Sequence, residues 1–187
     1  MTGSARNFLE FHDIPEAGLR SIVARAGELA EAWDERAMPQ SLAEKRVALI
    51  VDDGGWRNTT AFDLGIQAMG GICVQVPIAF NTREETGDLS GYLGNWFDML
   101  VIRTKELATL KAVAAASPVP VINARTRSNH PCETLGDLAY IKSRRLDRRA
   151  EGRWRGGGRK YPPLLGRSVD RIADRGGAGL SRTLAHQ

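Results

Sequence analysis

Three polar side chains, far apart along the chain, could together bind and activate a small anion. His130 precedes Pro131 at the start of a helix-like pattern, Arg103 ends an apolar run, and Arg57 lies two residues after a pair of glycines. Two guanidinium groups can neutralise a dianion through charge-assisted hydrogen bonds, and a neutral imidazole can donate to an oxygen on which negative charge develops. A helix that begins just after His130 favours the neutral imidazole, because the positive end of the helix dipole opposes protonation.

The segment 52–60, with the sequence DDGGWRNTT, has the composition of a phosphate-binding turn. Its glycines would let backbone N–H groups approach an anion, and its arginine could donate two hydrogen bonds to a phosphate. We expect Thr59 or Thr60 to cap the helix that follows. The alternatives are an ordinary turn with a surface arginine, an Arg103 that pairs with a carboxylate, and a structural His130.

Apolar patterns along the chain predict strands that alternate with helices. The run Arg46–Val51, which ends at two acids and two glycines, is typical of a strand buried on both faces. An amphipathic helix is predicted before it, at 13–36. The other expected elements are helices at 59–69, 88–96, 105–116 and 132–141, and strands at 72–76, 99–103 and 119–122.

Strands and helices that alternate through short connections predict an α/β fold, a parallel sheet with helices on both faces. Ligands of such sheets bind beyond the carboxyl ends of the strands. Polar stretches follow the first, third and fourth predicted strands, at 52–60, 103–104 and 123–133. We therefore expect these three stretches to meet at one crevice.

The overall composition limits the possible classes of protein. A chain of 187 residues can form one domain with a real core but not two full α/β domains. It contains no run of about 18 apolar residues and no signal-peptide pattern, so we expect a cytoplasmic protein without a membrane span. Cys73 and Cys132 match no CxxC spacing, and reduced thiols are expected. We expect neither a metal nor a cofactor.

Charge is distributed unevenly along the chain. Residues 1–141 hold 13 lysines and arginines against 18 acids, whereas residues 142–187 hold 13 against 4. We predict a domain at 1–145 and, at 146–187, an Arg/Gly-rich tail that is not a domain. One interpretation of the tail is nucleic-acid binding, since clustered arginines with Trp154 and Tyr161 could contact phosphates and stack on bases.

Several of these segments resemble one enzyme family. The run from His130 to Leu138, HPCETLGDL, resembles the HPCQxLxDL signature of ornithine carbamoyltransferases, a signature that aspartate carbamoyltransferases share with Thr in place of Cys. Val101–Thr104 resembles the strand-ending arginine of that family. Residues 48–65 align without a gap with the family's FEKxSTRTRxSFExG loop. The resemblance covers residues 7–141, which correspond to the family's carbamoyl-phosphate domain.

This resemblance implies transfer of a carbamoyl group from carbamoyl phosphate to the amine of an amino acid, as from ornithine to citrulline. It implies catalytic roles for Arg57, Arg103 and His130, which would polarise the carbamoyl oxygen. The implied carbamoyl phosphate site consists of Gly55, Trp56, Arg57, Asn58, Thr59, Arg103, His130 and Glu133. Family members form trimers with sites between subunits, so the loop at 79–87 is expected to contact a neighbouring subunit.

The chain departs from the family pattern at two places in this site. Residues 55–59, GWRNT, stand where the family has STRTR, so two hydroxyls and one guanidinium are missing. Each lost charge-assisted hydrogen bond costs about 1.5–3 kcal/mol. Glu133 replaces a Gln that accepts from the carbamoyl NH2 group, and a carboxylate would repel a nearby phosphate unless protonated.

The family's second domain, which binds the amino acid, has no visible counterpart in the tail. A reading-frame shift near Leu146 would explain both the basic tail and the missing domain, and we favour it over an evolved basic extension. We therefore expect a truncated protein with little or no turnover. The alternatives are a non-catalytic domain that binds phosphate or a similar anion, and nucleic-acid association through residues 142–187.

Overall fold

The computed structural model describes residues 7–52, 54–78, 80 and 84–151 of the chain. The chain divides into two compact units, Met1–Gly136 and Asp137–Gln187. All the strands of the described residues lie in the first unit. The tail from residue 152 onward lies outside the described residues, and the predictions of a shifted reading frame and of nucleic-acid binding rest largely on it.

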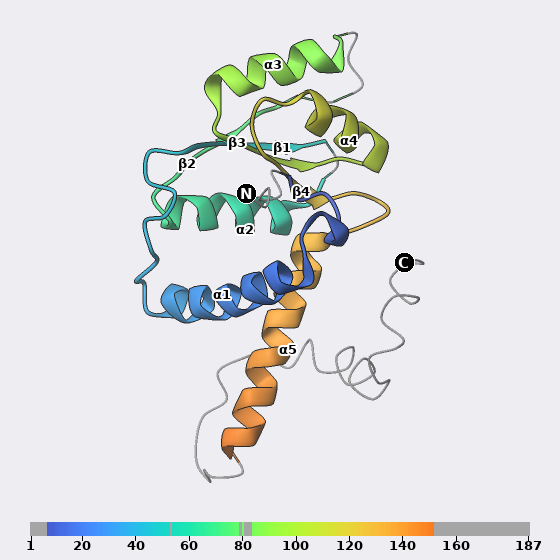
Figure 1. Cartoon of the computed structure of the whole chain (residues 1–187). Helices are drawn as coiled ribbons and strands as arrows, with labels where there is room; N and C mark the ends of the chain where they lie inside the picture. Colours follow the sequence, from blue (N-terminus) through green and yellow to red (C-terminus); the bar gives the residue numbers. More distant parts are fainter. Residues whose placement is uncertain (1–6, 53, 79, 81–83, 152–187) are drawn as a thin grey trace. The chain divides into compact units, whose positions relative to one another are not determined.

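The centre of the first unit is a four-stranded sheet in which every neighbouring pair is parallel (Figure 1). The strand order is β2-β1-β3-β4. The strands are β1 (Arg46–Val51), β2 (Ile72–Gln75), β3 (Met99–Arg103) and β4 (Val121–Arg125). The structure thus confirms the predicted α/β fold with a parallel sheet.

Helices cover both faces of this sheet. In Figure 1, α3 and α4 lie on one side, and α2, with α1 farther out, lies on the other. The helical elements are the 3-10 turn η1 (Phe11–Asp13), α1 (Glu16–Asp34), α2 (Trp56–Ala68), α3 (Thr86–Trp96), α4 (Leu107–Ala116) and α5 (Pro131–Glu151). Within the described ranges, no helix combines the length and the apolar composition needed to cross a lipid bilayer.

Two apolar clusters hold the layers together, one on each face of the sheet. Successive strand residues point to opposite faces, so β1 divides its side chains between the clusters. Ala48 and Ile50 pack with residues of α3 and α4, whereas Val47 and Leu49 pack with residues of α2. All four are at most 1% exposed. The near-continuous apolar run of β1 is therefore explained by burial on both sides, as predicted.

The prediction that the fourth strand ends at residue 122 was wrong, because β4 continues to Arg125. Asn123 is fully buried within the strand, and its amide donates to the carbonyl oxygen of Leu9 at 2.8 Å and to the side chain of Asn129 at 2.7 Å. These partners satisfy the two N–H groups of the amide, which makes a polar residue tolerable at a central position of the strand, while its buried Oδ1 has no hydrogen-bond partner in the described structure.

Two helices also differ from their predicted bounds. α2 begins at Trp56, three residues before the expected start, and its N-cap is Gly55 without a side-chain cap. The expected capping threonine was therefore wrong: the Thr59 hydroxyl donates instead to the carbonyl oxygen of Gly55 at 3.3 Å. α5 begins at Pro131, where the missing proline N–H costs nothing, and it continues to Glu151 rather than ending at 141.

Candidate functional site

A cleft of about 680 Å³ opens where the chain leaves β1, β3 and β4. The three polar stretches predicted to meet at one crevice all contribute to its wall, as the parallel topology requires. The predicted site residues that line it are Gly55, Arg57, Asn58, Arg103, His130 and Glu133. Gly54, Ala61, Phe62, Arg125 and Cys132 complete the lining.

Two predicted site residues, Trp56 and Thr59, are not among the lining residues. The Trp56 side chain is 73% exposed, and its ring centre lies 5.7 Å from the guanidinium carbon of Arg57, in a cation–π contact. Trp56 and Arg57 both belong to the first turn of α2. The start of this helix therefore presents Arg57 and Asn58 to the cleft, while the indole of Trp56 faces solvent.

Arg103 lies at the base of the cleft and is only 6% exposed. Its guanidinium fits against Gly55, where a β-carbon would overlap three of its atoms. Gly55 also has a φ of 156°, a backbone conformation that side chains with a β-carbon rarely adopt. The glycine is thus required twice, for its backbone conformation and for the space that Arg103 occupies.

Hydrogen bonds fix the ends of the strands and α2 relative to one another. The backbone N–H of Asp52 donates to the carbonyl oxygen of Arg103 at 2.9 Å, and the Thr104 hydroxyl donates to the Asp52 carboxylate at 3.1 Å. On the other side of the cleft, the Asn58 amide donates to the carbonyl oxygen of Ala124 at 3.4 Å. These contacts connect the β1–α2 turn to both β3 and β4.

His130 is positioned at the N-terminal end of α5, where its carbonyl oxygen accepts from the N–H of Thr134. Burial lowers the pKa of the imidazole from its ordinary value, and the positive charges of Arg125 and Arg103 lower it further, while Glu133 opposes the shift. His130 is therefore neutral near pH 7. The lowered pKa agrees with the expected neutral imidazole, although burial rather than the helix dipole is the main cause of the shift.

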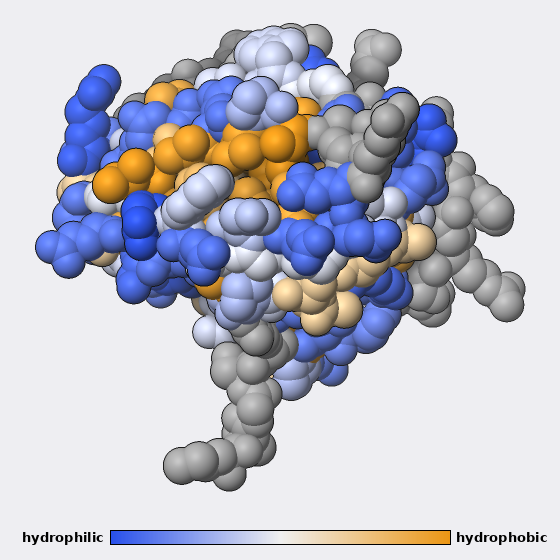
Figure 2. Space-filling view, turned by 90° about the horizontal axis from the view of Figure 1, so that it is seen from above, coloured by the Kyte–Doolittle hydropathy of each residue, from blue (hydrophilic) through white to orange (hydrophobic). Residues whose placement is uncertain are grey.

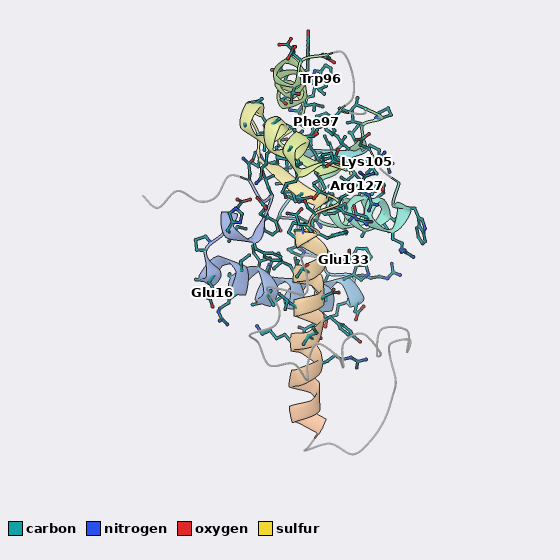
Figure 3. The ribbon with its side chains drawn as sticks, turned by 90° about the vertical axis from the view of Figure 1, so that its right-hand side faces the viewer. Glu16, Trp96, Phe97, Lys105, Arg127 and Glu133 are labelled. Carbon is teal, nitrogen blue, oxygen red and sulfur yellow. The ribbon has the colours of Figure 1, made fainter. Side chains whose placement is uncertain are left out.

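Glu133 engages the hydrogen-bond donor of that imidazole. In the first turn of α5 (Figure 3), its carboxylate oxygen Oε2 lies 2.8 Å from Nε2 of His130. The other ring nitrogen, Nδ1, is buried without a hydrogen-bond partner in the described structure. We place the proton of the neutral ring on Nε2, where it faces Glu133. The donor expected to polarise a carbonyl oxygen is thus already occupied.

Neither cysteine is prepared for nucleophilic chemistry. Burial raises the pKa of the Cys132 thiol to about 12, and its S–H donates to the carbonyl oxygen of Asn123 at 3.3 Å. Burial, together with the neighbouring Asp63, raises the pKa of Cys73 to about 12 as well. Both are free thiols, as predicted. Cys132 therefore contributes packing to the cleft wall.

Arg125 is a lining residue that the sequence analysis missed. The reason is the wrong end assigned to the fourth strand, which left this arginine inside a long polar loop. A usable signal was present: Arg125, like Arg103, occupies the carboxyl end of a strand, the edge at which ligands of parallel sheets bind.

One protein family matches most of the chain. Residues 6–143 match the family described as "Aspartate/ornithine carbamoyltransferase, carbamoyl-P binding domain". The chain belongs to the aspartate/ornithine carbamoyltransferase family. The match stops near the middle of α5, and it identifies the part of the chain that contains the cleft as the carbamoyl-phosphate-binding domain of that family.

Individual members of the family show how much of the architecture is shared. The ornithine carbamoyltransferase of Ruegeria pomeroyi is 31% identical over 147 residues, which cover 74% of this chain and 48% of that protein. The chain thus spans about half the length of the curated relatives that it matches.

Solved structures give the same picture. The ornithine carbamoyltransferase of Burkholderia thailandensis superposes with a TM-score of 0.69 at 27% identity, over 74% of this chain and 49% of that one. The Pyrococcus furiosus ornithine carbamoyltransferase superposes with a TM-score of 0.72 at 21% identity, over 76% of this chain and 46% of that one, a likeness of fold.

Proposed function

We propose that the cleft binds carbamoyl phosphate and that the chain carries the carbamoyl-donor half of a carbamoyltransferase. The observation that carries this proposal is the meeting of Arg57, Arg103 and His130, from three separate connections, in one cleft of a family domain that binds this ligand class. Two guanidiniums match the charge and the geometry of a phosphate dianion. Backbone N–H groups in the first turn of α2 add a favourable dipole.

In the proposed reaction, an amine attacks the carbamoyl carbon and a tetrahedral intermediate forms. Its oxygen gains negative charge, which Arg103 and the N–H of a neutral His130 would stabilise. The bond between that carbon and the phosphate oxygen then breaks, and phosphate leaves with the electron pair and takes up the proton that the amine nitrogen loses. Arg57 would neutralise the charge on the departing phosphate. The named relatives suggest ornithine as the amine, with citrulline as the product.

Two features predict low turnover by this chain. Glu133 competes for the N–H of His130 and adds a negative charge beside the anion site. In addition, the matched residues correspond to about half the length of each relative, and they match the family's carbamoyl-phosphate-binding domain. The trimer expected from the family remains part of this proposal.

Isothermal titration calorimetry with carbamoyl phosphate, together with an assay for citrulline in the presence of ornithine, tests this proposal. We expect saturable binding that Arg57→Gln weakens at least tenfold, because one charge-assisted hydrogen bond contributes about 1.5–3 kcal/mol. Absence of binding by the wild-type chain would remove the proposed function. Arg20→Gln is a matched control, since Arg20 lies on the exposed surface of α1 and pairs with Glu16.

A second candidate is a domain that binds an anion without catalysing transfer. The contact between Glu133 and His130 favours it specifically, because the proton donor of the proposed reaction is engaged. It predicts carbamoyl phosphate binding with no citrulline, even after the relatives' amino-acid-binding half is fused to this chain. If the fusion instead produces citrulline, the transferase assignment stands.

A further inference from the structure

An irregularity in the sheet brings Arg125 to the cleft. β3 and β4 pair Ile102 with Asn123, and the next pair joins Arg103 with Arg125, so Ala124 is passed over and the register shifts. An extra residue in one strand changes the face to which the following side chain points. Such bulges occur next to binding sites, where they redirect a side chain.

Without this shift, Arg125 would face away from the cleft. Ile122 and Ala124 belong to the apolar cluster on the α2 side of the sheet, together with Val101 of β3. Strict alternation would direct Arg125 to the same side as Asn123, which contacts Leu9 on the other face. The register shift instead makes Arg125 the neighbour of Arg103, and both side chains line the cleft.

Among the described lining residues, positive side chains outnumber acidic ones. Glu133 is the only acidic side chain in the described lining, and its carboxylate faces Nε2 of His130. Arg57 and Arg125 are exposed, and in the described part of the chain no acid lies within ion-pair distance of either. Both Arg103 and Arg125 are close enough to His130 to lower its pKa. Three guanidiniums therefore share one small volume.

The cleft also exceeds the size of a single phosphate group. Its volume of about 680 Å³ lies within the roughly 300–1,000 Å³ of pockets that hold small-molecule ligands. Arg103 lies at the base against Gly55, Arg57 on the first turn of α2, and Arg125 at the end of β4. The positive groups thus line the cleft from three different elements, which suits two linked anionic groups better than one.

We propose that Arg125 is a third anion-binding arginine and that the cleft takes a ligand with two linked anionic groups, of the diphosphate or phosphorylated-carboxylate class. One group binds at Arg57 and Arg103, and the second binds at Arg125. This inference rests on the proposed function only in that both require the cleft to bind a phosphate-type group. It adds a residue and a ligand class that carbamoyl phosphate binding does not need.

Calorimetry of the full chain with inorganic phosphate and with pyrophosphate, at constant pH and ionic strength, tests the inference. We expect pyrophosphate to bind at least about tenfold tighter than phosphate, since one charge-assisted contact contributes about 1.5–3 kcal/mol. Arg125→Gln should reduce that ratio to about twofold while phosphate affinity stays within twofold. Arg57→Gln should weaken both ligands.

Arg127→Gln is the matched control. Arg127 lies two residues further on, beside Lys105 (Figure 3), and its guanidinium pairs with Glu106 at 3.2 Å outside the cleft lining. This variant removes the same charge and should leave both affinities unchanged. An equal loss in the two variants would reveal a general charge effect and overturn the inference.

The remaining outcomes separate this inference from the proposed function. Phosphate binding with no preference for pyrophosphate, or a preference that Arg125→Gln leaves intact, overturns the role of Arg125 and leaves the proposed function standing. Binding of pyrophosphate alone supports the need for a second anionic group. Binding of neither ligand overturns both proposals. Circular dichroism and thermal melting of each variant establish that the fold is retained.

Discussion

Replacement of Gly55 by alanine should disable anion binding while leaving the protein folded. The new β-carbon would overlap the guanidinium of Arg103, which is 6% exposed and would have to shift from its position in the cleft wall. The backbone at this residue has a φ of 156°, which alanine adopts only with strain. The substitution therefore acts on the position of Arg103 and on the start of α2 together.

The two effects have different magnitudes and different readouts. A non-glycine residue in a sparsely populated backbone region costs about 1–3 kcal/mol, so we expect a loss of about that size in the free energy of unfolding. Displacement of Arg103 removes at least one charge-assisted contact to the anion, about 1.5–3 kcal/mol. The dissociation constant for carbamoyl phosphate or inorganic phosphate should therefore rise about 10- to 100-fold.

The neighbouring glycine provides the control. A β-carbon at Gly54 meets no atom within 4 Å, and that residue has no positive φ in the left-handed range. Gly54→Ala should therefore change stability little, within about 0.5 kcal/mol, and should lower anion affinity far less than Gly55→Ala, although Gly54 also lines the cleft. Urea denaturation and calorimetry of the two variants measure both quantities. Equal anion affinity in Gly55→Ala and wild type would refute the assigned contact between Gly55 and Arg103.

Three further perturbations test the electrostatics of the site. Glu133→Gln removes a negative charge from the cleft and keeps an oxygen that can accept from the N–H of His130. A carboxylate about 4 Å from a phosphate in water costs about 1 kcal/mol, so calorimetry should show about fivefold tighter phosphate binding. Weaker binding would contradict the assigned repulsion. Burial lowers the folded-state pKa of His130 below 6.5, so the unfolded chain binds protons more readily, and the free energy of unfolding should fall as pH decreases from about 6.5 toward that depressed pKa. In urea titrations, the free energy of unfolding of His130→Asn should depend less on pH. An unchanged pH dependence would contradict the assignment to His130. The pKa values of Cys73 and Cys132 are raised to about 12, so both thiols should react slowly with a thiol reagent at pH 8 and rapidly once urea unfolds the chain. Fast reaction of the folded chain would contradict their burial.

Those parts of the fold that follow from apolar patterning were predictable from the sequence. The bounds of β1 and β3 agree with the predictions, because each is an apolar run buried on both faces. The meeting of 52–60, 103–104 and 123–133 also followed, because parallel strands present their carboxyl ends at one edge. The roles assigned to the site residues stay predictions.

The errors arose where tertiary contacts override local pattern. Asn123 signalled a loop, but its partners Leu9 and Asn129 lie elsewhere in the fold and could not be inferred from the strand itself. The start of α2 was missed because a glycine provides the cap without a side chain. The register shift that reorients Arg125 depends on how β3 and β4 pair. The alternation of apolar and polar residues within either strand does not predict it.

The two edge strands of the sheet differ in what lies beside them. Beyond β4, the backbone N–H of Phe8 donates to Val121, the N–H of Asn123 donates back to Phe8, and the Asn7 side chain accepts from Val121, all at 2.8–2.9 Å. β2 is outermost at the opposite border and exposes Ile72 and Val74, and apolar residues reach the surface on the face shown in Figure 2. An edge strand with exposed apolar side chains is a template for pairing with another chain. A further strand could therefore pair along β2, whereas the residues that precede η1 occupy the corresponding position beside β4.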